Sequence, residues 1–260
     1  MSSAMVMAGP GQHPEIETRP VPSPGPGEAV VRVRGSSLNY HDTVNLMGLI
    51  SGPWPRVPMT DGCGEVVAVA DDVRTVTVGD RVMGAFNPFW LDGTMTRANR
   101  RWIPGDHGDG WLTQHRAYPA TALVRAPSHL SDVEAATLVC AGHTAWSSLQ
   151  TASITAGDVV VTLGTGGVSL YTLQLAKAMG AAVVVTSSSD AKLDVARSLG
   201  ADHVVNDDST PDWESLVLEI TEGRGADLVV DLGGPDTLRR SVAATRMDGT
   251  VAVVGVLSGF

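Results

Sequence analysis

The second half of the chain alternates short apolar runs with longer segments in which apolar residues recur every three or four positions. The short runs predict strands at 158–163, 182–186, 203–205, 227–231 and 250–255. The longer segments predict helices at 168–179, 190–199, 212–222 and 235–247. Strands and helices that alternate at these lengths are typical of a parallel sheet covered by helices on both faces.

The first half has a different pattern, with many prolines, glycines and short β-branched runs. Residues 27–35 (GEAVVRVRG) alternate like a strand, and further strands are predicted at 64–73 and 78–84. The segment 86–115 carries few helical signals, so we expect an irregular loop or lobe there. This half is therefore predicted to be an all-β, barrel-like domain.

A helix is predicted between the two halves, over residues 131–150. Ser131 is followed three residues later by Glu134, which is the pattern of a capping box at a helix start. We therefore divide the chain into a β domain at 1–130, a connecting helix at 131–150 and an α/β domain at 151–260.

The stretch VVVTLGTGGVSLY (159–171) places a glycine turn between a predicted strand and a predicted helix. Glycine allows a tight turn and a close approach of the backbone to a phosphate, and the helix N-terminus favours negative charge. The full pattern G-x-G-x-x-G is incomplete because Ser169 stands at the third glycine position. A plain turn is the alternative, but the alternating context favours a dinucleotide site. Its candidate residues are Gly164, Thr165, Gly166, Gly167 and Val168.

The helix after this turn is expected to bury a face formed by Val168, Tyr171, Leu175, Ala176 and Met179. Gly180 follows the helix and is expected to end it.

The end of the second strand of this domain bears on the choice between NAD and NADP. An NAD site expects an acidic residue there, about 20 residues after the first glycine. This strand instead ends in hydroxyl residues, with Asp190 placed in the following helix. Ser187, Ser188 and Lys192 would suit the extra phosphate of NADP, so NADP is the expected cofactor. The alternative is that one serine only caps the next helix.

Composition and charge exclude several classes of function. The chain is 43% apolar and 18% charged, which is typical of a globular protein. Its 18 basic and 28 acidic residues give a net charge of −10, which disfavours nucleic acid and anionic membranes as partners. No apolar stretch approaches the roughly 20 residues of a membrane span, and the N-terminus does not resemble a secretion signal. We therefore expect a cytoplasmic protein.

Several motifs together resemble the medium-chain dehydrogenase/reductase superfamily, in the branch of quinone oxidoreductases and zinc-independent alcohol-dehydrogenase-like proteins. The motifs are PGPGEAVVRVRGSSLNYHD (24–42), MTDGCGEVVAVADDV (59–73), VGDRVMG (78–84), AATLVCAGHTAW (135–146), GTGGVSLYTLQLAKAMGA (164–181) and SLGADHVVN (198–206). The resemblance implies a GroES-like β-barrel domain followed by a Rossmann domain, that is, an α/β fold with a doubly wound parallel sheet.

The resemblance also places the zinc ligands of metal-dependent relatives at Asn39, Thr60 and Cys140 of this chain. Asparagine and threonine are poor zinc ligands, and the four-cysteine structural zinc loop is absent because the chain has two cysteines. A zinc-independent enzyme with no metal is therefore expected. An improvised site of Asp61, His41 and Cys140 is the less favoured alternative.

The same resemblance places the segment LNYHD beside the nicotinamide. Asn39 would then form hydrogen bonds to the substrate, and Tyr40 or His41 would donate the proton. The alternative for His41 is a structural histidine paired with Asp42 at a strand end. The segment 86–115 would form either a wall of the substrate site or a surface lobe.

Further cofactor contacts are implied by the resemblance alone. They are Thr144, Leu232, Gly233, Gly255 and Val256.

These observations predict an NADP(H)-dependent, zinc-independent oxidoreductase acting on a small carbonyl compound, quinone or activated alkene. The alternatives are an alcohol dehydrogenase with residual metal use and a non-catalytic NADPH-binding protein. The sequence does not identify the substrate. The resemblance implies that relatives continue past the fifth Rossmann strand, so the sequence is expected to be either truncated or a shortened version of the fold. A homodimer is expected if that further segment is present.

Overall fold

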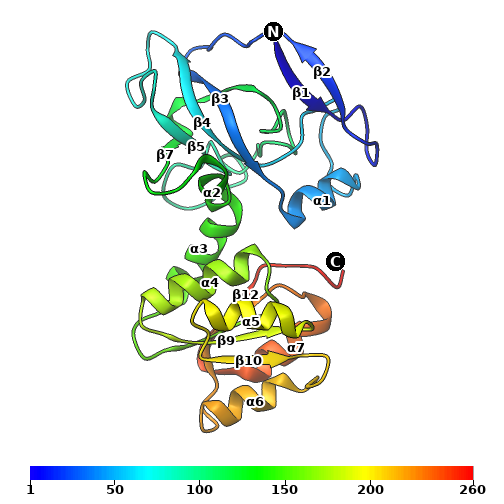
Figure 1. Ribbon diagram of the computed structural model, residues 1–260, viewed down its shortest axis with the longest axis vertical. Helices are drawn as coiled ribbons and strands as arrows, with labels where there is room; N and C mark the ends of the chain where they lie inside the picture. Colours follow the sequence, from blue (N-terminus) through cyan, green and yellow to red (C-terminus); the bar gives the residue numbers. More distant parts are fainter. Residues whose placement is uncertain (260) are drawn as a thin grey trace. The chain divides into compact units, whose positions relative to one another are not determined.

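The computed structural model describes residues 1–259, which form two compact units, one up to Cys140 and one from Ala141 onward (Figure 1). In the first unit, β3, β4 and β5 agree with the strands that the sequence predicts, while β1, β2, β6 and β7 were not predicted. The strands of this unit are β1 (Ser2–Val6), β2 (Glu15–Arg19), β3 (Glu28–Ser37), β4 (Asp61–Val69), β5 (Arg81–Gly84), β6 (His115–Pro119) and β7 (Leu123–Arg125).

These strands form antiparallel sheets. Strands β1 and β2 form a two-stranded ribbon, and the other five form one sheet in the order β6-β3-β4-β5-β7. No helix or strand lies between β5 and β6 among the described residues, in agreement with the irregular segment expected at 86–115. The first unit is therefore mainly β structure, as expected for a GroES-like domain, although it also contains the short helices described below.

The core of the β domain is built around Trp111 and Tyr118, which are both fully buried. Their ring centroids lie 4.9 Å apart, and the Tyr118 hydroxyl donates to the carbonyl oxygen of Ala85 (2.6 Å). Gly62 and Gly84 leave room for the indole, because a Cβ atom on them would lie 2.2 and 1.9 Å from Trp111 ring atoms. The two glycines are therefore steric requirements of this core.

Helical segments of the β domain differ from the sequence prediction. Helix α1 (Tyr40–Leu46) was not predicted, and it places His41 in a helix rather than at a strand end. A short 3₁₀-helix, η1, covers Ala120–Ala122. The predicted single helix at 131–150 is divided into α2 (Asp132–Ala136), the π-helix η2 (Leu138–Gly142) and α3 (His143–Thr151).

The capping box at the start of α2 agrees with the prediction. The Ser131 N–H donates to the Glu134 carboxylate (2.8 Å), and the Glu134 N–H donates to the Ser131 hydroxyl (3.4 Å).

The second unit contains the predicted parallel sheet, in the order β10-β9-β8-β11-β12. Its strands are β8 (Val159–Thr162), β9 (Ala182–Ser187), β10 (His203–Asn206), β11 (Ala226–Asp231) and β12 (Thr245–Val253). After α3, its helices are α4 (Gly167–Ala178), α5 (Asp190–Ser198), α6 (Trp213–Ile220) and α7 (Pro235–Ala244). This alternation is the Rossmann-like arrangement expected from the sequence.

The central strands of this sheet are buried on both faces, which explains their continuous apolar runs. Val160 packs in a cluster with Leu173 of α4, whereas the adjacent Val161 packs in another cluster with Val217 of α6. Helix α4 buries Ser169, Thr172, Leu173 and Ala176. Of the face predicted from the sequence, Ala176 is buried, and Val168, Leu175 and Met179 pack against the same cluster, so these four residues are confirmed. The prediction missed Ser169, Thr172 and Leu173, which are buried beside them.

A buried carboxylate, Asp227, secures the start of β11. It accepts hydrogen bonds from the Val159 N–H (2.8 Å), from both terminal nitrogens of Arg224 (2.7 and 2.8 Å) and from Arg246 Nε (2.5 Å). Burial alone would raise its pKa, but the bonds from Arg224, Val159 and Arg246 together hold that pKa well below its usual range.

None of the helices in the described part of the chain is both long and apolar enough to cross a membrane.

Candidate active site

The glycine turn connects β8 to the N-terminus of α4. Gly164 has a φ of +77°, which glycine adopts without strain, and Gly166 is the N-cap of the helix. A Cβ atom on Gly164 or Gly166 would meet no other atom within 4 Å, whereas one on Gly167 would approach the Ala141 Cβ (3.2 Å). The turn therefore leaves open space in front of a 12-residue helix, and this arrangement fits a pyrophosphate group.

Ser169, which stands at the third glycine position, has a defined structural role. Its side chain is fully buried, and its hydroxyl donates to the Leu163 carbonyl oxygen (2.8 Å). The serine thus fits the close contact between helix and strand that the third glycine usually permits, and its hydroxyl is satisfied there.

The end of β9 lies next to the glycine turn. The Gly164 N–H donates to the Thr186 hydroxyl (3.4 Å), and the hydroxyls of Thr165 and Ser187 are 3.3 Å apart. Ser187 is buried, while the predicted phosphate-binding residues Ser188 and Lys192 are exposed.

Sequence reasoning missed an acidic neighbour of this strand end. The Thr186 hydroxyl also donates to the carboxylate of Asp207, which follows β10 (3.2 Å). The available sequence signal was an acidic residue just after the predicted strand at 203–205, and the structure shows that this strand pairs with β9.

The other predicted cofactor residues of the sheet lie on two adjoining loops, held by Asp231. This fully buried carboxylate accepts hydrogen bonds from the Gly234 N–H (3.0 Å), the Thr237 hydroxyl (2.7 Å) and the Ser241 hydroxyl (2.6 Å). Its carbonyl oxygen accepts from the N–H groups of Val254 and Gly255.

These bonds bring Leu232 and Gly233 next to Gly255 and Val256. A Cβ atom on Gly255 would lie 2.1 Å from the Leu232 carbonyl oxygen, so only glycine fits there. Val168 is the second residue of α4, directly after the glycine turn, and Thr144 lies half-buried in α3.

His41 is the centre of a second group of predicted site residues, in the β domain. Its Nε2 atom lies 2.8 and 3.1 Å from the two carboxylate oxygens of Asp106, and its ring meets Phe86 edge-on at 5.4 Å. The suggested pairing with Asp42 was wrong, because the partner comes from the irregular segment 65 residues further on. Burial lowers the pKa of His41, but the hydrogen bond and charge of Asp106, with the charges of Asp42 and Asp61, raise it overall.

Asp106 is itself held in place by buried groups. Asn45 Nδ2 donates to the Asp106 carboxylate (2.8 Å) and to the Gly105 carbonyl oxygen (2.6 Å). Arg56, also buried, donates to the Asp106 carbonyl oxygen and to Asn45 Oδ1, and its guanidinium stacks on Trp54 at 3.7 Å. The carboxylate that contacts His41 is therefore rigidly positioned.

Asn39 binds the other two buried carboxylates. Its Nδ2 atom donates to Asp61 (2.9 Å) and lies 3.4 Å from Asp42, while its N–H donates to Asp42 (2.8 Å). Asp42 also accepts from the Thr60 N–H (3.0 Å), so this carboxylate ties the start of α1 to the start of β4.

Burial raises the pKa of Asp61 to about 7, assisted by the charge of Asp42 and opposed by hydrogen bonds from Asn39, Thr60 and the Cys140 backbone. Tyr40, in contrast, is 48% exposed, and no contact of its hydroxyl is seen in the described structure.

The residues at the predicted zinc position do not fit a zinc ion. Asn39 and Thr60 offer a neutral amide and a neutral hydroxyl, which are poor zinc ligands. Separately, burial raises the pKa of the Cys140 thiol, with further contributions from the charges of Asp61, Asp42 and Asp106. Among residues 1–259, no group of three or more His, Cys, Asp and Glu side chains is arranged to hold a metal. In the improvised alternative, His41 is bonded to Asp106 through Nε2, and Asp61 accepts a hydrogen bond from Asn39.

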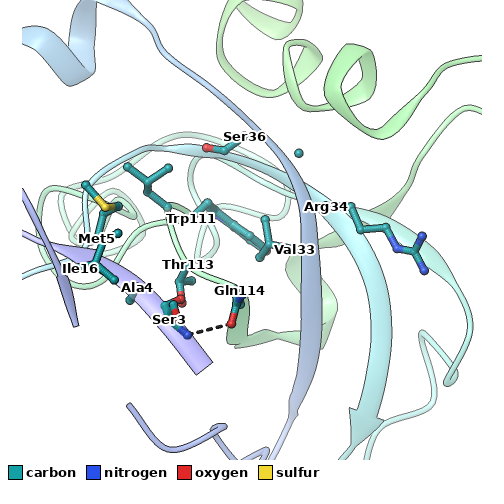
Figure 2. Close-up of a pocket in the computed structure, with 12 residues that line it drawn as sticks. Ser3, Ala4, Met5, Ile16, Val33, Arg34, Ser36, Trp111, Thr113 and Gln114 are labelled. Carbon is teal, nitrogen blue, oxygen red and sulfur yellow. Dashed lines mark hydrogen bonds between the residues drawn. The ribbon is translucent and has the colours of Figure 1, made fainter. Parts of the chain in front are cut away.

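A separate pocket of the β domain lies between β1, β3 and the segment that leads into β6 (Figure 2). Trp111, Met5 and Val33 contribute apolar surface, and the Ser3 N–H donates to Gln114 Oε1 across the pocket (2.9 Å). It contains none of the three predicted catalytic residues. Ser36 connects the pocket to the site, because its hydroxyl donates to the Asp61 carbonyl oxygen (2.7 Å).

A Rossmann-type unit with an open glycine turn, together with a GroES-like β domain that holds a histidine–carboxylate cluster, defines the class of dinucleotide-dependent oxidoreductases. Comparisons with known proteins agree. The alcohol dehydrogenase GroES-like domain family matches residues 25–128, and the zinc-binding dehydrogenase family matches residues 167–259.

Individual proteins are similar over most of the chain. A zinc-type alcohol dehydrogenase-like protein of Schizosaccharomyces pombe is 42% identical, covering 90% of this chain and 69% of its own length. A 2-haloacrylate reductase of a Burkholderia species is 34% identical, covering 92% and 68%. The crystal structure of an NAD-dependent alcohol dehydrogenase aligns with a TM-score of 0.85 at 34% identity, covering 98% and 79%. The chain belongs to the medium-chain dehydrogenase/reductase superfamily.

Proposed function

We propose that the protein is an NADP(H)-dependent oxidoreductase that works without zinc. It transfers hydride between the nicotinamide and a small carbonyl compound, quinone or activated alkene. The observation that carries this proposal is the pairing of His41 with Asp106, close in sequence to Asn39, where the resemblance would put a zinc ligand. This pair can supply a proton donor in place of a Lewis acid. The similarity to a 2-haloacrylate reductase, which by its name acts on an activated alkene, supports the substrate class.

The dinucleotide would be held by the Rossmann unit. Its pyrophosphate would lie against the N–H groups of the glycine turn, and Ser187, Ser188 and Lys192 would contact the 2′-phosphate of NADP(H). The backbone of Leu232, Gly233, Gly255 and Val256, with Thr144, would line the remainder. When bound, the nicotinamide supplies or accepts the hydride.

His41 would provide the proton in the direction of reduction. Its Nε2 atom is engaged by Asp106, so the protonated ring carries its transferable proton on Nδ1. Reduction of a carbonyl group then adds hydride to carbon and the Nδ1 proton to oxygen, leaving a neutral imidazole whose Nε2–H remains bonded to Asp106. Asn39 holds Asp61 and Asp42 in place, and Tyr40 is the alternative donor because it is exposed and adjacent.

The test is turnover after metal removal. The purified chain is treated with a chelator, its zinc content is measured, and oxidation of NADPH is followed with aldehydes, quinones and activated alkenes. Turnover without zinc is expected, with a loss of roughly 10²-fold or more in His41→Gln and a smaller loss in Tyr40→Phe. Activity that disappears with zinc and returns only with zinc would support an alcohol dehydrogenase instead. NADPH binding without turnover of any substrate would support a non-catalytic protein.

A further inference from the structure

The carboxylate of Asp207 lies two hydrogen bonds away from the glycine turn. The Gly164 N–H donates to the Thr186 hydroxyl (3.4 Å), and that hydroxyl donates to Asp207 Oδ2 (3.2 Å). The Asp207 N–H also donates to the Ser187 carbonyl oxygen (3.2 Å). Asp207 is therefore attached through both its backbone and its side chain to the end of β9.

This position has a defined chemical meaning in a dinucleotide site. The end of the second strand faces the adenosine ribose, where a carboxylate accepts hydrogen bonds from the free hydroxyls of NAD(H) and repels the phosphate of NADP(H). Strand β9 has no acidic residue of its own at this end. Because β9 and β10 are parallel and Asn206 is paired with Ser187, Asp207 lies at the same edge of the sheet as the carboxyl end of β9.

We propose that Asp207 is a specificity-determining residue that limits the preference of this enzyme for NADP(H) over NAD(H). Its carboxylate takes the place of the acidic residue that β9 lacks, and it comes from the end of the neighbouring strand β10. The inference rests on the proposed dinucleotide-dependent function and concerns which of the two cofactors the same site selects.

The charges around this strand end act in opposite directions. Lys192 is exposed and attracts the 2′-phosphate. Asp190 also lies nearby, but its carboxylate accepts a hydrogen bond from Asn206 Nδ2 (2.7 Å). The exposed Asp208 is anchored only through its N–H, which donates to Asn206 Oδ1 (3.1 Å). Asp207 differs from both because its side chain contacts the end of β9 itself.

The experiment measures dissociation constants of NADPH and NADH by nicotinamide fluorescence for the full chain and three variants. Asp207→Asn removes the charge and keeps the shape, Asp207→Glu keeps the charge, and Asp208→Asn is the matched control one residue further on. Removing one charge from the surroundings of a doubly charged phosphate is expected to raise the ratio of the NADH to the NADPH constant about tenfold in Asp207→Asn. Asp208→Asn should change that ratio less than about twofold, and Asp207→Glu should leave it closer to wild type than Asp207→Asn does.

The possible failures are distinguishable. If both cofactors bind and the ratio in Asp207→Asn equals that of wild type, or if Asp208→Asn shifts it equally, the role of Asp207 is refuted while the proposed function stands. If the wild-type chain binds neither dinucleotide, the proposed function and this inference are both refuted. Circular dichroism and the melting temperature of each variant show whether a change in the ratio comes from altered folding.

Discussion

Gly166→Ala separates cofactor binding from folding. Gly166 is the N-cap of α4, its φ of −79° and ψ of −177° are open to any residue, and an added Cβ would have no neighbour within 4 Å. Alanine is a poorer N-cap than glycine, by about 0.5–1 kcal/mol, but it restricts the unfolded chain, which stabilises by about 0.4–1 kcal/mol. The free energy of unfolding should therefore change by less than about 1 kcal/mol.

Binding should respond much more strongly than folding. The new methyl group occupies the space in front of the helix, where the pyrophosphate has to approach the backbone closely. A loss of tenfold or more in affinity, at least about 1.4 kcal/mol, is expected for both NADPH and NADH. A large loss of affinity at nearly constant stability could not come from general damage to the domain, because such damage would lower both.

The assay combines urea unfolding with a fluorescence titration of each dinucleotide. Gly9→Ala is the control, because Gly9 lies in the β domain and its added Cβ would meet only the flexible Gln12 side chain, at 3.4 Å. That variant should bind both dinucleotides like wild type. Unchanged binding in Gly166→Ala, at unchanged stability, would refute the assignment of this turn to the pyrophosphate.

Three further predictions concern proton donation, acid stability and core packing. Asp106→Asn removes the main group that raises the pKa of His41, so the protonated ring should be lost at lower pH. In a profile of kcat/KM for reduction against pH, the alkaline limb should therefore move to lower pH. An alkaline limb at the wild-type position would contradict His41 as the proton donor. Asp227→Asn should lower the free energy of unfolding by about 2 kcal/mol at neutral pH, measured by urea unfolding. Folding depresses the pKa of the Asp227 carboxyl, so its contribution to stability is present above the unfolded pKa of about 3.9 and is lost as the pH falls below that value. The variant should therefore differ less from wild type at acidic pH. An equal difference at all pH values would contradict a stabilising role of the ionised carboxylate. Gly84→Ala should destabilise the β domain by about 3 kcal/mol or more, because its Cβ would overlap the Trp111 ring. The measurement is urea unfolding followed by tryptophan fluorescence, and a variant as stable as wild type would contradict this packing.

Features set by local periodicity were predictable from the sequence. The strands and helices of the Rossmann unit follow from apolar runs and glycine punctuation, and the capping box at Ser131 marks a helix start from two residues alone. Local periodicity was less informative in α4, where buried Ser169 and Thr172 replace apolar residues. A hydrophobicity pattern assigns such residues to the surface, so it identified Val168, Leu175, Ala176 and Met179 on the packed face but missed the two buried polar residues beside them.

The features that were missed depend on contacts between distant residues. Asp106 meets His41 because the irregular segment returns to α1, and no local pattern records that approach. The carboxylate of Asp207 was missed because the fingerprint for NAD looks for an acid on the second strand itself, whereas this acid follows the third. The sequence therefore indicated which kinds of side chain occur at the site, but not the carboxylates that contact them from distant parts of the chain.

Binding of a nicotinamide dinucleotide by the Rossmann unit can be measured by titrating the purified chain with NADPH and with NADH while following nicotinamide fluorescence. We expect saturable binding of both, with NADPH bound more tightly by a margin that Asp207 limits. Tighter binding of NADH would overturn the assignment of NADP(H) and leave the dinucleotide site in place. Binding of neither would show that the glycine turn is not a dinucleotide site.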